Sequence, residues 1–216
     1  MWIEDFALRL LEVIEGVTRK IAPGPTPSFN EAHVVKALEI ISKYGSVGRI
    51  RMSKELGLGE GTTRTLLKHL KNKGITHTTR SGISFSEEGK KLLSDLRNKL
   101  SEGVEVPSSS LTVGAFNIAI LVRNSAHSVG SGMEQRDIAI KSGASGATTL
   151  VFSGDKLSMP KCVDDVSKSM PILHAELVTK LKPNQNDVII VGSGENRELA
   201  EIGAKMAAIK LLKKAN

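Results

Sequence analysis

The chain has 216 residues, a length that suits two small domains or one large one. Its apolar fraction of 40% excludes a largely disordered chain, and its single cysteine excludes an internal disulfide framework or a cysteine-rich zinc site. Aromatic residues make up 3%, which argues against a base-stacking surface for RNA or single-stranded DNA, and the formal net charge is +7.

The first predicted elements are two helices separated by prolines. Residues 2–20 place apolar residues at helical spacing, and the prolines within 23–27 end this helix, since proline lacks the amide donor. Residues 28–31, Ser-Phe-Asn-Glu, have the spacing of a capping box that starts at Ser28. They predict a second helix that runs to about Tyr44.

Residues 49–85 have the order helix, glycine-containing turn, second helix and β-hairpin. The second helix is predicted over 60–73, because its apolar positions fall at i, i+3, i+4 and i+7 of one face: Thr63, Leu66, Leu67 and Leu70. Gly74 can end this helix in a left-handed conformation, and 75–85 has the composition of two strands that turn near Arg80. This order predicts a winged helix-turn-helix, which places its second helix in the DNA major groove.

Positive charge is concentrated in the same segment. Residues 49–80 contain eight Lys or Arg and two acidic residues, so they hold +6 of the net +7, whereas 105–216 contains thirteen basic and eleven acidic residues. Attraction to phosphates is the main sequence-independent source of DNA affinity. The alternative is a solvated basic face on a winged domain that contacts proteins.

The residues expected to meet base edges lie near the start of the second helix: Thr62, Arg64 and Thr65. The residues expected to hold phosphates are Lys68 and Lys71 on the same helix, with Arg49, Arg51 and Ser53 on the preceding one. Arg80, at the hairpin turn, is expected to reach the backbone or the minor groove. Arginine suits base reading because its guanidinium can bond guanine O6 and N7 together.

Two further helices, over 2–20 and 86–101, lie outside this module. Both carry apolar stripes that need burial, and helices flanking winged domains commonly pair across a dimer axis. We therefore predict a homodimer, whose symmetry would match two DNA half-sites. Packing of both stripes within the same domain is the alternative.

A polar linker is expected at 102–110, between a DNA-binding domain at 1–104 and a second domain at 111–216. The second domain has the predicted order β-α-β-β-α-β-α, which indicates a two-layer α/β domain and makes the whole chain α+β. Its expected elements are a strand at 111–123, a helix at 133–141 with Ser131 and Glu134 at capping-box spacing, a hairpin at 148–153 and 156–159, a helix at 172–181, a strand at 187–191 and a last helix to about 214.

Two glycine-rich segments of the second domain are expected to form loops between a strand and a helix. They are Gly130, Ser131 and Gly132, and Gly192, Ser193 and Gly194. Backbone amides at a helix N-terminus can hold a phosphate or carboxylate, so each segment is a candidate site for a small anionic effector. Neither completes a phosphate-loop or dinucleotide fingerprint, and plain strand-to-helix turns also need glycine.

The second domain shows no catalytic constellation, so we predict that the chain is not an enzyme and holds no metal or cofactor. His127, His174 and Cys162 match no metal-ligand or Cys-His spacing, and we expect Cys162 to be a part-buried, inert thiol. No apolar run reaches the length of a membrane span, and acidic residues interrupt the N-terminus. We therefore expect a soluble, cytoplasmic chain with no membrane partner.

Residues 48–75, which contain SKELGLGEGT and then RTLLK and KGI, resemble the winged-helix domains of archaeal transcriptional regulators. Residues 133–152, MEQRDIAIKSGASGATTLVF, and 187–195, DVIIVGSGE, resemble the uncharacterised C-terminal domain of a family of archaeal winged-helix proteins. That domain is grouped structurally with the GAD insertion domain of some aminoacyl-tRNA synthetases. One departure is Thr63, where Val is usual; its methyl group can still pack, but the interface is less apolar.

This resemblance implies a DNA-binding N-terminal module and a regulatory or dimerising C-terminal one. The sequence therefore predicts a sequence-specific transcriptional regulator that binds double-stranded DNA. Its C-terminal domain is expected to dimerise or to sense a small ligand. The alternative is an enzyme or ligand-binding module with an appended winged domain used for protein contacts.

Overall fold

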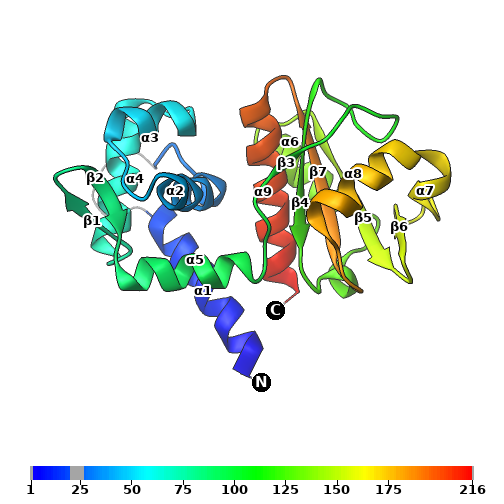
Figure 1. The fold of residues 1–216 in the computed structure, drawn as a ribbon, viewed down its shortest axis with the longest axis horizontal. Coiled ribbons are helices and arrows are strands. Elements are labelled where there is room, and N and C mark those ends of the chain that lie inside the picture. The colour runs from blue at the N-terminus through cyan, green and yellow to red at the C-terminus, as the bar shows by residue number, and fades with distance from the viewer. Residues whose placement is uncertain (1, 20–26, 216) are drawn as a thin grey trace. The chain divides into compact units, whose positions relative to one another are not determined.

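The structure is a computed structural model and describes residues 2–19 and 27–215. The chain folds into two compact units, which divide between Leu96 and Arg97 (Figure 1). Helices and one short hairpin form the first unit, and a five-stranded sheet is the centre of the second.

The N-terminal unit contains the helices and the hairpin that the sequence predicts. Most of the proline-containing stop expected at 23–27 lies outside the described residues. In chain order the elements are α1 (Trp2–Thr18), α2 (Glu31–Tyr44), α3 (Arg49–Leu56), α4 (Glu60–Asn72), β1 (Thr76–Thr79), β2 (Gly82–Phe85) and α5 (Glu87–Arg97).

The start of α2 corrects the predicted cap. Asn30, not Ser28, is the N-cap: its side-chain oxygen accepts the backbone amide of His33 at 3.3 Å. The Nδ1 atom of His33 in turn accepts the backbone amide of Asn30 at 3.2 Å. Asparagine is as good an N-cap acceptor as serine, so Asn30 can take this position. His33 is then the third helical residue, and its side chain completes the capping box in place of the usual glutamate or glutamine. Burial of the ring, helped by the charge of Lys36, lowers the pKa of His33 from 6.5 to about 4.

Helix α4 packs its predicted apolar face into the core of the N-terminal unit. Leu66 and Leu70 are fully buried there, as is Thr63. The hydroxyl of Thr63 has no hydrogen-bond partner among the residues that the structure describes. The turn that precedes α4 contains Gly57 in a left-handed conformation, with φ 68°. Glycine adopts this conformation without strain, which explains its presence here.

Where the structure describes their side chains, the apolar stripes of the two flanking helices are largely covered within one chain. The buried residues are Leu10, Leu11, Ile14 and Val17 on α1, and Leu92, Leu93 and Leu96 on α5. A hydrogen bond also joins α4 to α1: the Nδ1 atom of His69 donates to the Val17 carbonyl oxygen at 2.7 Å. This burial favours packing within the domain, so these stripes no longer argue for a dimer; the homodimer itself stays a prediction.

The hairpin is attached to the segment that leads into α3. Val47 pairs with Ile83 of β2 through two backbone hydrogen bonds, of 3.0 and 2.9 Å. Gly82, at the start of β2, has φ 136°, and a side-chain carbon there would overlap the backbone of Val47. The close approach therefore needs a glycine, and it joins the hairpin to the start of α3.

The C-terminal unit contains an antiparallel sheet with the strand order β3-β4-β7-β5-β6. The strands are β3 (Val104–Glu105), β4 (Phe116–Val122), β5 (Gly146–Ser153), β6 (Lys156–Ser158) and β7 (Val188–Gly194). The helices are α6 (Met133–Lys141), α7 (Val166–Ser169), α8 (Pro171–Leu181) and α9 (Arg197–Lys214), with a 3-10 turn, η1 (Ala126–Ser128).

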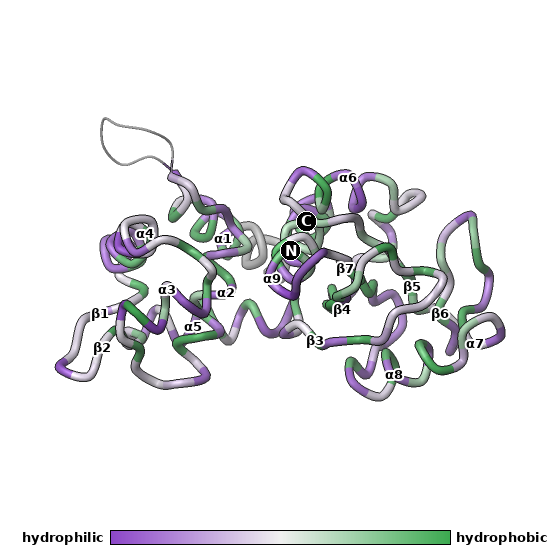
Figure 2. Tube along the Cα trace, turned by 90° about the horizontal axis from the view of Figure 1, so that it is seen from above, coloured by the Kyte–Doolittle hydropathy of each residue, from purple (hydrophilic) through white to green (hydrophobic). Residues whose placement is uncertain are grey.

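Helices cover both faces of this sheet, which corrects the predicted two-layer arrangement. α6 and α9 contact one face, and α8 lies with α7 on the other (Figure 2). Ala119 and Leu121 of β4 pack against Leu173 and Leu177 of α8 in one apolar cluster. Every residue of β7 is buried, as expected of a strand with both faces covered.

The segment expected to be a linker, 102–110, belongs to the second unit. It contains β3, in which Val104 pairs with Ala119 of β4, and its neighbour Ser101 accepts the Leu121 amide at 2.9 Å. The units thus divide at residue 97, whereas the predicted domains were 1–104 and 111–216. Polar composition suggested a linker here, but the segment pairs with β4, the next strand along the chain.

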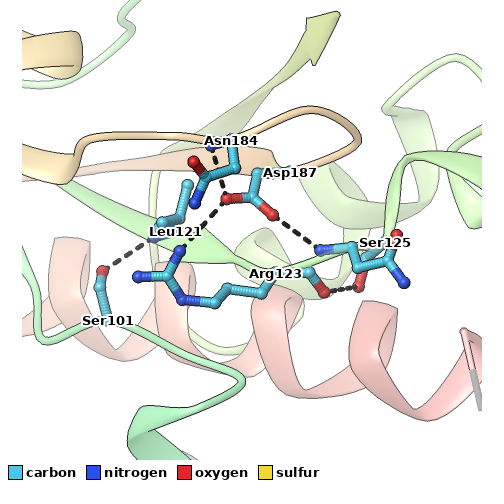
Figure 3. Close-up of polar contacts among 7 residues, drawn as sticks. Ser101, Leu121, Arg123, Ser125, Asn184 and Asp187 are labelled. Carbon is cyan, nitrogen blue, oxygen red and sulfur yellow. Dashed lines mark hydrogen bonds and ion pairs between the residues drawn. The ribbon is translucent and has the colours of Figure 1, made fainter.

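A buried carboxylate organises the turn before β7. The Asp187 side chain is 4% exposed and accepts the backbone amides of Asn184 at 2.9 Å and Asn124 at 2.8 Å. Arg123 adds an ion pair at 3.4 Å (Figure 3). These contacts satisfy the carboxylate and tie the end of β4 to the start of β7.

Candidate nucleic-acid interface

A groove of about 590 Å³ lies between α4 and the β1–β2 hairpin. Its basic lining residues are Arg49, Arg64, Lys68, Lys71 and Arg80. Most of the remaining lining residues are glycine or carry hydroxyl groups. All five were predicted to contact DNA, and the fold brings them together from α3, α4 and the hairpin turn.

Helix α4 separates its apolar and basic residues on two sides. Arg64, Lys68 and Lys71 are exposed and spaced i, i+4 and i+7, so they share one side of the helix. Leu66 and Leu70 lie on the opposite, buried side. Core packing of the leucines therefore directs the three basic side chains into the groove.

None of these five basic side chains is paired with an acidic side chain that the structure describes. None of them forms an ion pair or hydrogen bond with any other residue that the structure describes. Arg64 and Lys68, four residues apart on one helix, repel each other in the absence of a bound anion. The groove is thus a concentrated, uncompensated positive surface suited to phosphate groups.

Four of the predicted contact residues do not line this groove. Thr62 is two residues before Arg64, which places it on roughly the opposite side of α4. Thr65 is exposed, and its hydroxyl donates to the Gly61 carbonyl of the preceding turn at 3.1 Å. Arg51 and Ser53 are the other two.

Local contacts engage both of these α3 residues. The guanidinium of Arg51 stacks on the ring of Tyr44, with 4.7 Å between its carbon and the ring centroid. The hydroxyl of Ser53 donates to the Leu58 carbonyl at 2.5 Å, which holds the turn between α3 and α4. The one proton that Ser53 could offer to a phosphate is therefore in use.

Sequence reasoning missed Gly48, which lines the groove at the N-terminus of α3. As the N-cap residue it has no side chain, and no side-chain cap bond is formed. The first amides of α3 are therefore uncapped beside the basic groove, and a helix N-terminus favours a negative group. A glycine directly before a basic helix was the available signal.

One of the two glycine-rich segments of the second unit is not a loop. Gly192, Ser193 and Gly194 form the end of β7, inside the sheet. Gly192 lies against the backbone of α9 at Ala200 and Ala204, where a side chain would overlap. The hydroxyl of Ser193 donates to Asn117 at 2.7 Å. These glycines serve close packing of a helix on a strand, and the space expected for an anion is filled.

The other segment does lie before a helix. Gly132 is the N-cap of α6 in a left-handed conformation with φ 82°, and no side chain caps the helix. The capping box predicted for Ser131 and Glu134 is therefore absent. Gly130 has open space beside it. Anion binding at Gly130, Ser131 and Gly132 stays a prediction.

Cys162 is exposed, which corrects the expected part-buried thiol. Across residues 2–19 and 27–215 there is no cluster of three or more His, Cys, Asp or Glu side chains that could hold a metal ion. In the same described part of the chain, every helix is too short or too polar to cross a membrane.

Known proteins resemble both units. Residues 34–100 match the family described as the CggR N-terminal DNA binding domain, and residues 113–211 match a domain of unknown function, DUF4443. A solved structure of a hypothetical protein from Pyrococcus horikoshii OT3 is 28% identical in sequence and has a TM-score of 0.67, covering 83% of this chain and 92% of that chain. No curated protein matches the chain. The basic groove therefore lies within the part of the chain that is similar to a DNA-binding domain.

Proposed function

We propose that the chain is a sequence-specific transcriptional regulator that binds double-stranded DNA through a winged helix-turn-helix. In this proposal α3 and α4 are the helix-turn-helix and the β1–β2 hairpin is the wing. The observation that carries it is the groove between α4 and the hairpin, which gathers five basic side chains that pair with no acidic side chain in the described part of the chain. The similarity of residues 34–100 to a DNA-binding domain supports it.

In this proposal each wall of the groove has its own role. α4 enters the major groove, and Arg64, in its first half, reads a base edge. Lys68 and Lys71 bind the phosphates of the strand that runs between α4 and the wing. Arg80 reaches the backbone or minor groove from the hairpin turn, and the uncapped start of α3 at Gly48 holds a further phosphate.

The C-terminal unit is proposed to regulate this binding, by dimerisation or by sensing a small anion at 130–132. Its similarity is to a domain of unknown function, so the proposal assigns it no chemistry and no catalytic role. Gly130 and the uncapped α6 are the features on which the ligand version depends. The homodimer is part of the proposal because palindromic operators match two-fold symmetric readers.

The test is selection of bound duplexes from a random pool by the full chain. We expect a consensus sequence, and a palindromic one if the protein binds as a dimer. Recovery of duplexes without any consensus, or no retention of DNA at low salt, would contradict sequence-specific binding.

A variant series assigns the reading to Arg64. Arg64→Ala is expected to weaken binding to the selected site by about 1–3 kcal/mol and to flatten the preference at one base pair. Lys90→Ala is the control, since Lys90 is an exposed cation on α5 that pairs with Glu87 and does not line the groove. Equal affinities for both variants on the selected site would remove Arg64 from the interface.

A further inference from the structure

A second cavity of the N-terminal unit lies on residues that the DNA interface does not use. It has a volume of about 240 Å³ and lies between α1, α5 and the segment that joins α4 to the hairpin. Its apolar lining consists of Leu10, Val13, Ile75 and Leu92. Drug-sized ligands occupy pockets of about 300–1,000 Å³, so this one suits a smaller molecule.

Charged groups of both signs surround this apolar lining. On the α5 side Glu88, Lys91 and Asp95 share one helix face at i, i+3 and i+7. On the other side are Arg9 of α1 and Lys73, whose amine lies against Gly16 of α1. The acids therefore come from one wall, and two of the three cations come from the facing wall.

These charges are close but do not neutralise one another by contact. Within the described part of the chain, none of the five forms an ion pair or a hydrogen bond. Burial raises the pKa of Asp95, against the opposing charge of Lys91. The carboxyl group is thus partly withdrawn from water without a direct partner, a condition that a bound cation would relieve.

We propose that this pocket binds a small zwitterion with an aliphatic body, of the class of the apolar L-α-amino acids. The carboxylate of the ligand lies against Arg9 and Lys73, its ammonium group against Glu88 and Asp95, and its side chain on the apolar lining. A simple anion would leave the two acids unpaired, and a simple amine would leave the cations unpaired. A ligand with both charges matches the acids of one wall and the cations of the other.

The experiment is calorimetric titration of the full chain, without DNA, with L-valine, L-leucine, L-isoleucine and L-methionine. 4-Methylpentanoate and 3-methylbutylamine, which carry one charged group each of leucine, are titrated beside them. We expect at least one amino acid to bind, and to bind at least about tenfold more tightly than either single-charge compound. No heat with any of the four amino acids at millimolar concentration overturns the proposal, as does equal binding of the amino acid and its single-charge analogues.

Two variants assign the binding to this pocket. Asp95→Asn keeps the shape of the side chain and Arg9→Gln keeps a polar side chain without the charge; each is expected to weaken binding of the amino acid by about tenfold. Asp95→Asn is further expected to leave 4-methylpentanoate unaffected or improved, which a general loss of structure would not do. Glu87→Gln and Lys90→Gln are the matched controls, since these residues pair with each other on the exposed side of α5.

Unchanged affinity in Asp95→Asn and Arg9→Gln would place the ligand elsewhere and contradict the proposal. All of these titrations are made without DNA. Their outcome is therefore separate from the DNA-binding function proposed above, and either proposal can fail while the other stands.

Discussion

Thr63 brings a hydroxyl group into the core beneath α4. The residue is 1% exposed, and its Oγ1 has no hydrogen-bond partner among the residues that the structure describes. A buried polar atom that loses its water without gaining a partner destabilises the folded state. The position therefore stabilises the helix less than an apolar residue of the same shape would.

Thr63→Val is expected to raise the free energy of unfolding by about 1 kcal/mol, because it removes the unsatisfied hydroxyl and keeps the volume. Urea unfolding followed by circular dichroism measures the change. Thr63→Ser is the matched control: it keeps the hydroxyl and removes the methyl group, so it should destabilise. A Val variant no more stable than the native chain would mean that the hydroxyl finds a partner.

His33 makes the stability of the N-terminal unit depend on pH. Its pKa is about 4 in the folded chain and near 6.5 when unfolded, because folding buries the ring. Between these values the unfolded chain binds a proton that the folded chain does not. The contribution of His33 to the free energy of unfolding is therefore complete above pH 6.5 and is lost as the pH falls towards 4.

His33→Gln is expected to remove this part of the pH dependence and to keep the cap, since glutamine at this position can also accept the Asn30 amide. The free energy of unfolding is measured at pH 7 and at pH 4.5 for both chains. The native chain should lose more stability between the two values than the variant. Equal losses would show that His33 does not titrate differently in the folded state.

At the scale of elements, the hairpin depends on its contact with the segment before α3. Gly82→Ala is expected to destabilise the chain by roughly 1–3 kcal/mol, because φ is 136° and the added carbon meets the backbone of Val47. Thermal unfolding measures the change. Gly61→Ala on α4 is the control: nothing lies within 4 Å of that position, so alanine there should stabilise the helix by up to about 1 kcal/mol.

If Gly82→Ala were as stable as the native chain, the hairpin would not depend on this close approach. The DNA affinity of Gly82→Ala should also fall, since Arg80 is carried by the same hairpin.

Local signals predicted the helices and the hairpin of the N-terminal unit well. The apolar spacing in α4, the left-handed Gly74 and the basic side with Arg64 all act within a few residues of one another. The role of Gly192 could not be found in this way, because its reason is the contact with α9. The same holds for β3, whose pairing with β4 is long-range.

The candidate site was predicted only in part. Five of the nine residues expected to contact DNA line the groove. Their charge followed from residue type, and the side of α4 on which three of them lie followed from their spacing. Arg51 and Ser53 were assigned from residue type alone, and the ring of Tyr44 and the carbonyl of Leu58 could not be anticipated as their partners. The continuous apolar run of β7 did indicate that helices cover both faces of the sheet, because a strand that is buried on both faces has no polar side.

At the scale of the whole molecule, the groove gathers five basic side chains that pair with no described residue, so DNA binding should depend strongly on salt. Lys68→Gln and Lys71→Gln are each expected to reduce the slope of log affinity against log salt by about one unit, because each removes a phosphate contact and its released counterion. Binding of the selected duplex and of an unrelated duplex is measured over a salt series. Each variant should weaken binding to the two duplexes by the same factor.

Lys90→Gln is the control for total charge, since Lys90 lies outside the groove. A slope reduced equally by Lys90→Gln would mean that the whole-chain charge, and not the groove, attracts the DNA.

The backbone pairing of Val47 with Ile83 has a consequence for the DNA itself. Two hydrogen bonds set the separation between the hairpin and the start of α3 before any duplex arrives. A duplex whose backbone already follows that spacing binds without bending, whereas a stiffer or wider one has to be deformed, at an energy that depends on its base steps. The selected operators should therefore share base steps of a particular flexibility at positions that no side chain touches.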